Sequence, residues 1–291
     1  MNDIKTKFNE NIQMFKCPVC GDGMLVDDLK SIVCTNGHCF DISKRGYVNL
    51  LLRPGKSHYD KELFEARSII CKAGFFDPLI EAVVSLIYQR ISSMNSELMT
   101  VLDAGCGEGF HLSRVMSDLH KKTNFNIQGI GIDISKEEIQ IAAKNYKDII
   151  WCVADLARVP FKDKQFQVVL NILSPSNYKE FGRILCDEGI LIKVVPGSSY
   201  LKELREVFYQ ETDRVAYSND KVTEHFGRNF NIIGTQKVLY NFSIKNEELG
   251  YLIKMTPLSW GTTDEKVQKA FSSGIDYVTL DFDIIVGNRK L

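Results

Sequence analysis

Short apolar runs alternate with amphipathic stretches through the middle of the chain. Five runs predict buried strands, at residues 98–103, 126–133, 149–155, 165–171 and 189–195. Strands that alternate with helices are typical of a parallel, doubly wound sheet, in which ligands bind outside the carboxyl ends of the strands. The pattern therefore predicts an α/β fold of the Rossmann-like kind, with a binding site along that edge of the sheet.

Helices are predicted ahead of this region, and two longer strands behind it. Residues 60–73 have a helical pattern that ends at Gly74, and an Asp-Pro pair opens a second helix over 77–92. Aliphatic residues recur at helical spacing along the second helix, so we expect one of its faces to pack against the sheet. The apolar runs at 230–245 and 276–289 suit an antiparallel edge on the same sheet.

Composition is that of an ordinary globular protein. The chain has 291 residues, of which 44% are hydrophobic and 25% charged, which gives room for one large domain and a small one. No apolar run reaches membrane-spanning length, and residues 1–15 lack the apolar segment of a signal peptide, so we expect a cytoplasmic protein. Eight cysteines are then expected to be reduced, and clustered ones are interpreted as metal ligands. With a net charge of −1, a nucleic-acid partner requires a local basic patch.

Two close pairs of soft ligands lie near the N-terminus. Cys17 and Cys20 form a Cys-x2-Cys pair, and thirteen residues later comes Cys34, followed by His38 and Cys39. Such pairs suit tetrahedral zinc, and a Cys-x3-His spacing favours His38 over Cys39 as the fourth ligand, although Cys39 stays an alternative. A module this small buries too little apolar surface to fold unaided, so we expect the zinc to be structural.

A basic stretch follows the zinc ligands. Residues 43–59 contain Lys44, Arg45, Arg53 and Lys56 and no acid, with aromatic residues between them. This composition makes the stretch the best candidate for contacts to the phosphates and bases of a nucleic acid. A solvated loop that contains a packed strand explains the same residues equally well.

A glycine-rich turn follows the first predicted strand. It runs D-x-G-x-G-x-G from Asp103 through Gly105 and Gly107 to Gly109. Glycines at a turn before a helix let a ligand lie against bare backbone. A dinucleotide fingerprint would place its third glycine where this chain has Phe110, so that interpretation is weakened. The turn instead resembles motif I of the class I S-adenosylmethionine-dependent methyltransferases.

Polar residues close the neighbouring strands. Asp133 ends the second strand, where its carboxylate can accept from ribose hydroxyls, and Asp155 ends the third, where it can accept from the adenine amino group beside the Leu156 amide. Together with Asp103, these acids predict a nucleoside-binding edge. The fourth strand ends at Asn171, but the sequence that follows departs from N-P-P-Y, which disfavours exocyclic amines as methyl acceptors.

Sequence blocks on both sides of this fold carry a more specific resemblance. They are C-P-V-C with the later C-x3-H, F-D-I-S-K-R-G-Y-V-N-L-L, K-E-L-F-E-A-R, V-L-D-A-G-C-G-E-G, V-V-P-G-S-S-Y-L-K-E-L and L-I-K-M-T-P-L-S-W. From about Phe15 to the C-terminus the chain resembles the ribosomal large-subunit RNA guanine-N1 methyltransferases. It is similar to their Gram-positive branch, which is associated with macrolide (tylosin) resistance.

The resemblance implies methyl transfer from S-adenosylmethionine to N1 of a guanine in a 23S ribosomal RNA hairpin near the peptide exit tunnel. It implies zinc ligands at Cys17, Cys20, Cys34 and His38, and cofactor contacts at Phe76, the motif residues including Glu108, His111, Leu112 and Tyr200. From composition alone, Phe76 is either a core residue or a lid over the cofactor. Some relatives are homodimers whose paired zinc modules shape the RNA cleft, so the resemblance leaves a homodimer and a monomer as alternatives.

The expected organisation is a zinc-binding RNA-recognition module over residues 1–59, a helical linker over 60–77 and a methyltransferase domain over 78–291. Two rival functions remain open. One is a small-molecule methyltransferase with a structural zinc, which the basic stretch argues against. The other is a zinc-dependent RNA-binding protein with a vestigial cofactor site, which the intact glycines and acids argue against.

Overall fold

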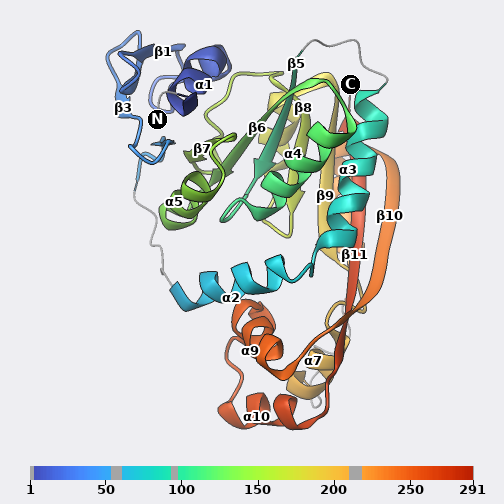
Figure 1. Cartoon of the computed structure of the whole chain (residues 1–291). Coiled ribbons are helices and arrows are strands. Elements are labelled where there is room, and N and C mark those ends of the chain that lie inside the picture. Colours follow the sequence, from blue (N-terminus) through green and yellow to red (C-terminus); the bar gives the residue numbers. More distant parts are fainter. Residues whose placement is uncertain (1–2, 54–60, 93–97, 210–217, 291) are drawn as a thin grey trace.

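The N-terminal part forms a small unit beside a large sheet (Figure 1). The computed structural model describes residues 3–53, 61–92, 98–209 and 218–290. The small unit contains α1 (Asp3–Asn11), η1 (Ile12–Met14), β1 (Met24–Asp27), β2 (Ser31–Cys34) and β3 (Cys39–Asp41). Its three strands pair antiparallel in the order β1-β2-β3, which brings the two predicted ligand pairs toward each other.

The large sheet has eight strands in the order β10-β11-β9-β8-β5-β6-β7-β4. Their bounds are β4 (Tyr47–Asn49), β5 (Leu98–Ala104), β6 (Asn126–Asp133), β7 (Ile150–Val153), β8 (Phe166–Ile172), β9 (Leu185–Pro196), β10 (Phe230–Ser243) and β11 (Tyr277–Arg289). The strands from β4 to β9 run parallel, and β11 is antiparallel to both β9 and β10. The predicted α/β sheet and its antiparallel edge are confirmed.

Helices cover both faces of the sheet, and Figure 1 shows the layer in front of it. One layer contains α3 (Asp77–Ile91), α4 (Phe110–Lys122) and α5 (Lys136–Asn145), and the other contains α6 (Tyr178–Ile184), α8 (Asp220–Asn229) and α1. Side chains along a strand alternate between the faces, so Val101 joins one core and Leu102 the other. The predicted packing of α3 against the sheet is confirmed by the complete burial of Leu79, Val83 and Ile87 in the first core.

Further helices gather beyond the carboxyl ends of the parallel strands, at the bottom of Figure 1. They are α2 (Lys61–Lys72), α7 (Lys202–Tyr209), α9 (Asn246–Met255), η3 (Pro257–Ser259) and α10 (Asp264–Ser272). The predicted helix over 60–73 corresponds to α2, which packs against α9. These helices therefore roof the edge where the sequence places the ligand. No helix in the described parts of the chain is long and apolar enough to cross a membrane.

The small unit is packed against the sheet domain. The Phe15 and Phe161 rings lie 4.8 Å apart, and Lys7 forms an ion pair with Asp148 at 3.0 Å. Residues 47–49, which the predicted division groups with the zinc module, form β4 and pair in parallel with β7 in the large sheet. The chain therefore crosses from the module into the sheet well before residue 59.

Candidate active site and metal centre

The four predicted zinc ligands come together in the small unit. The ligand atoms of Cys17, Cys20, Cys34 and His38 all lie within 4.8 Å of one another. The Sγ atoms of Cys20 and Cys34 are 3.7 Å apart, and the Nδ1 atom of His38 lies 3.2 Å from the Cys34 Sγ. Cys39 is exposed and outside the group, so the structure resolves the ambiguity in favour of His38.

This donor set fits zinc. Zn–S bonds of about 2.3 Å in a tetrahedron place two sulfurs about 3.8 Å apart, close to the distance between Cys20 and Cys34. Hydrogen bonds from the Asp22 backbone and the Asn36 side chain lower the pKa of the Cys20 thiol to about 7, which favours the thiolate that binds the metal. Four protein ligands leave no position for a reactive water, so the site is structural.

The three glycines of the turn differ in what lies next to them. Gly105 and Gly109 have positive φ angles of +84° and +80°, and a Cβ atom on them would lie 1.8 Å from the Ser174 Oγ and 2.4 Å from the Trp151 ring. These two glycines are therefore required for packing against the protein itself. Gly107 has no atom closer than 3.6 Å to its Cβ position. Its φ is also positive, at +55°, and a Cβ atom there would only touch Arg67 and Glu138 at ordinary contact distance, so Gly107 is the glycine of the three at which packing within the protein leaves room beside the cavity.

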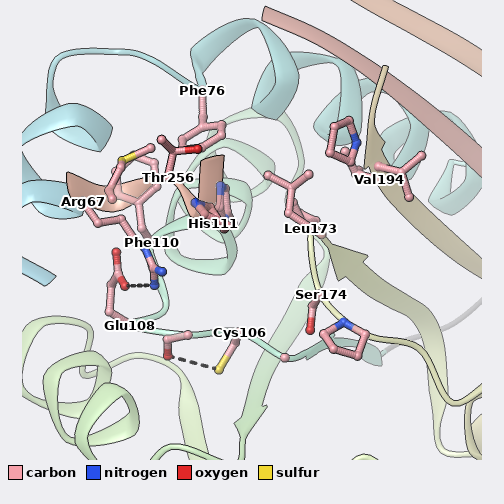
Figure 2. Close-up of a pocket in the computed structure, with 18 of the residues that line it drawn as sticks. Arg67, Phe76, Cys106, Glu108, Phe110, His111, Leu173, Ser174, Val194 and Thr256 are labelled. Atoms are coloured by element: carbon pink, nitrogen blue, oxygen red, sulfur yellow. Dashed lines mark hydrogen bonds and ion pairs between the residues drawn. The ribbon is translucent and has the colours of Figure 1, made fainter. Parts of the chain in front are cut away.

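A cavity of about 450 Å³ opens beside this turn, beneath the roof of α2 and α9 (Figure 2). Six of the predicted cofactor residues line it: Phe76, Gly105, Gly107, Glu108, His111 and Tyr200. Seven do not: Asp103, Gly109, Leu112, Asp133, Asp155, Leu156 and Asn171. The turn and the start of α4 form one wall, and the ends of β8 and β9 form the opposite wall.

Two of the predicted acids lie near the turn, and one of them, Asp133, bonds to it. Asp133 accepts hydrogen bonds from the backbone N–H groups of Gly107 and Ser135, both at 2.9 Å. Burial, and next the charge of Asp133, raise the pKa of Asp103 to about 8. Asp103 is therefore mainly protonated at pH 7, and its Oδ1 has no hydrogen-bond partner within the described residues.

Asp155 and Leu156 line a second groove next to the cavity. The Oδ1 atom of Asp155 accepts from the Ala157 N–H at 2.8 Å, as in an Asx turn. The groove is bounded on its other side by Asn177 and His225. Asp155 and Leu156 thus lie just beyond the carboxyl end of β7, as predicted, but they line the second groove and not the larger cavity.

Three of the predicted cofactor residues, Asn171, Leu112 and Gly109, have side chains or side-chain positions that are occupied within the protein. The side chain of Asn171 donates to two carbonyl groups and accepts from Ser176 and Lys193. An asparagine has no further capacity, so Asn171 shapes the wall and has no side-chain group for the cofactor. The Leu112 side chain is completely buried in the core, and the Trp151 ring covers the Cβ position of Gly109, so neither residue lines the cavity.

The neutral imidazole of His111 forms part of the cavity wall. Burial, and next the charge of Arg67, lower the pKa of His111 to about 4. Its Nε2 atom has no partner among the residues that the structure describes. The Phe76 ring lies edge-on to His111 with the centroids 4.7 Å apart, so Phe76 is at once a buried residue and a wall of the cavity.

Several further groups at the site were not predicted from the sequence. Arg67 on α2 bonds through Nη1 to Glu108 and Glu138, both at 2.9 Å, and thereby fixes the roof to the glycine turn. Burial and the charge of Asp133 raise the pKa of Glu138 to about 7. Thr256 and Trp260 also line the cavity. A signal was present, because Arg67 ends the K-E-L-F-E-A-R block and the other two lie in L-I-K-M-T-P-L-S-W.

The observed groups fit S-adenosylmethionine. The cavity is built on a glycine turn at the carboxyl edge of a parallel sheet, next to the Gly107 backbone and to polar atoms of Asp103 and His111 that have no partner in the described part of the chain. This turn, this strand order and the acid that ends β6 define a class I S-adenosylmethionine-dependent methyltransferase.

Comparison with known proteins places the chain within that class. The family description "Methyltransferase domain" matches residues 95–248, and the zinc ribbon "RlmA, N-terminal" matches residues 15–56. YxjB of Bacillus subtilis, a candidate 23S rRNA (guanine-N(1)-)-methyltransferase, is 44% identical over 96% of this chain and 98% of that protein. The 23S rRNA (guanine(748)-N(1))-methyltransferase of Streptomyces fradiae is 28% identical over 94% of this chain and 96% of its own length. The chain belongs to the family of the 23S rRNA guanine-N1 methyltransferases.

Proposed function

We propose that this protein transfers the methyl group of S-adenosylmethionine to N1 of a guanine in a hairpin of 23S ribosomal RNA near the peptide exit tunnel, and that the modification affects macrolide susceptibility. The observation that carries the proposal is the 44% identity to YxjB, which extends across both the zinc ribbon and the methyltransferase domain. A ribosomal RNA substrate implies that the protein acts in the cytoplasm.

The reaction is chiefly a matter of positioning. S-adenosylmethionine supplies an electrophilic methyl carbon, and correct orientation of the two reactants is worth up to about 7–11 kcal/mol. We assign Asp133 to the ribose hydroxyls, Asp155 with the Leu156 amide to the adenine, and Phe76, His111 and Tyr200 to the cavity wall around the cofactor. The guanine must leave its stack before its Watson–Crick edge can reach the cavity.

The N-terminal residues 1–59 are proposed to select the RNA, residues 60–77 to link the two parts, and residues 78–291 to carry the chemistry. Lys44, Arg45 and Arg53 are exposed, which suits phosphate contacts, whereas Lys56 lies outside the described residues. Arg45 also donates to Gln140 on α5, so the basic stretch and the catalytic domain form one continuous surface. A homodimer that pairs two such surfaces is the proposed assembly.

The test is to incubate the purified protein with labelled S-adenosylmethionine and unmodified 23S ribosomal RNA, and to map the product by primer extension. Methylation at N1 blocks base pairing and stops the polymerase at the modified guanine. Label in RNA with no stop would contradict N1 as the target atom. A small-molecule methyltransferase would leave the RNA unlabelled, and a vestigial cofactor site would give no S-adenosylmethionine binding in calorimetry.

Trp260 gives a direct measure of RNA binding. It lines the cavity yet is 67% exposed, while Trp151, the other of the two tryptophans, is completely buried. An exposed tryptophan at such a rim suits stacking on a base, worth about 1–3 kcal/mol. We expect the hairpin RNA to quench tryptophan fluorescence in the wild type, and Trp260→Ala to raise the KM for RNA about tenfold.

Trp260→Phe is the matched control, because phenylalanine keeps an aromatic face and should retain most of the RNA affinity. The buried Trp151 should leave residual, unquenched emission in Trp260→Ala. An unchanged KM in the alanine variant, together with no quenching in the wild type, would remove Trp260 from the RNA-binding surface.

A further inference from the structure

Lys193 lies in an unusual environment on β9. Its side chain is buried, with only 5% of the residue exposed, and it lines the same cavity as the glycine turn. Its Nζ donates to the Asn171 Oδ1 and to the Ser174 carbonyl oxygen, both at 2.5 Å. No carboxylate within the described residues forms an ion pair with it. Lysines are almost never buried without a charged partner, because burial of an unpaired charge is costly. The position of Lys193 therefore indicates a functional role.

We propose that Lys193 is the catalytic residue that removes the proton from N1 of the guanine. The proposal rests on the function proposed above and names the base that this function requires. A neutral amine has two N–H bonds and one lone pair. The Asn171 Oδ1 and the Ser174 carbonyl oxygen accept hydrogen bonds from the two N–H groups. The lone pair is then free to accept a proton from a group in the cavity. Figure 2 shows Ser174 beside the glycine turn, and Val194, the residue after Lys193, on the side of the cavity away from Glu108.

The surroundings of Lys193 favour its neutral form. Burial lowers the pKa of the Lys193 amine to about 8, close to the operating pH expected of a general base. On the adjacent strand β11 the register partner of Lys193 is Ile285, and the acid next to it on the same face is Asp283, which pairs with Val195 and is held by Lys237 and Asn219. The cavity wall has five other ionisable side chains, those of Arg67, Cys106, Glu108, His111 and Tyr200.

None of these groups is a better base. The pKa of His111 falls to about 4 through burial, so its imidazole binds a proton too weakly to assist at neutral pH. Glu108 is bonded to the Arg67 guanidinium at 2.9 Å. Burial raises the pKa of Tyr200 and of Cys106, so neither is deprotonated near pH 7. Lys193 is the group of this set whose pKa and hydrogen bonding both suit proton removal.

The chemical step then balances. The N1–H bond breaks, and the proton moves to the Lys193 Nζ, which becomes an ammonium group. The electron pair left on N1 forms the new bond to the methyl carbon as the carbon–sulfur bond breaks, and that bonding pair stays on sulfur. The ammonium group is held by Asn171 and Ser174 until it returns its proton to water through the open side of the cavity.

The test compares Lys193→Met, Lys193→Arg and Lys193→Ala in single-turnover methylation of the RNA hairpin, with saturating S-adenosylmethionine and RNA. In the wild type, the rate should rise about tenfold per pH unit at low pH and level off near pH 8, because only the neutral amine accepts a proton. All three variants should lose at least 100-fold in rate near pH 8. The arginine variant is decisive, since a guanidinium keeps the donors and the charge but does not act as a base.

Two measurements separate a base from a structural brace. Added methylamine should restore the rate of Lys193→Ala in proportion to the concentration of the free amine. If Lys193 only supported the cavity wall, the rate would not depend on the amine concentration in this way. Lys202→Met, on the exposed start of α7, is the control and should match the wild type. Calorimetric binding of S-adenosylmethionine reports whether each variant is folded.

The possible results distinguish this proposal from the proposed function. If the wild type methylates guanine N1 and Lys193→Arg is as fast, Lys193 is not the base although the function stands. A Lys193→Ala variant that binds the cofactor and is not rescued by methylamine would also overturn the proposal. A wild type that methylates no guanine N1 would overturn the function itself.

Discussion

Asp133→Ala is expected to weaken S-adenosylmethionine binding by about 100-fold. In the protein alone, Asp133 already accepts from the Gly107 and Ser135 N–H groups, and a carboxylate has about four lone-pair sites. Two sites remain for the ribose hydroxyls. Loss of those two charge-assisted bonds costs on the order of 2–4 kcal/mol, and loss of the bond to Gly107 frees the turn that faces the cavity.

Isothermal titration calorimetry measures this effect directly. Asp133→Asn keeps one acceptor oxygen and should fall between the wild type and the alanine variant. Asp118→Ala, which removes an acid paired with Lys121 on the surface of α4, is the matched control and should bind normally. Zinc content and circular dichroism show whether Asp133→Ala is folded. Normal cofactor affinity in a folded, zinc-loaded Asp133→Ala would contradict the assignment of this carboxylate.

The parts of the fold that local chemistry determines were predictable from sequence. Buried parallel strands are continuous apolar runs, and the chain marks their ends with Asp103, Asp133 and Asp155, so the five central strands were found close to their observed bounds. The zinc ligands were found for the same reason. Spacing within each pair is local, and tetrahedral zinc admits few alternatives.

The parts that depend on contacts between distant segments were not predictable. Arg67 meets Glu108 and Glu138 across 41 and 71 residues, and a single sequence has no local signal for such pairings. Similarly, the sequence does not reveal that Gly109 is required by the Trp151 ring, since that packing exists only once β7 lies beside β6. The same applies to Lys193, whose burial follows from its register between β8 and β11.

Cys34→Ser is expected to abolish RNA methylation while S-adenosylmethionine binding survives. Structural zinc contributes on the order of 10–16 kcal/mol of binding free energy to a small module, and a serine hydroxyl is a poor substitute for the thiolate. The Cys34 Sγ lies 3.7 Å from the Cys20 Sγ and 3.2 Å from the His38 Nδ1. Loss of this sulfur therefore leaves the metal site with three ligands. Every residue that lines the cofactor cavity lies at position 67 or later, and the sheet domain buries a core of its own. The cavity should therefore persist.

Cys39→Ser is the matched control, because Cys39 is the adjacent exposed cysteine outside the ligand group. We expect Cys39→Ser to retain zinc and activity, whereas Cys34→Ser loses its zinc, binds S-adenosylmethionine within about threefold of the wild type, and methylates RNA at least 100-fold more slowly. Zinc content by atomic absorption, cofactor affinity by calorimetry and methyl transfer are measured on the same preparation. Zinc loss in Cys39→Ser instead would assign the fourth ligand to Cys39. Full RNA methylation by zinc-free Cys34→Ser would show that the RNA is recognised elsewhere on the chain, and a loss of cofactor binding would show that the module also supports the sheet through β4 and the Phe15–Phe161 contact.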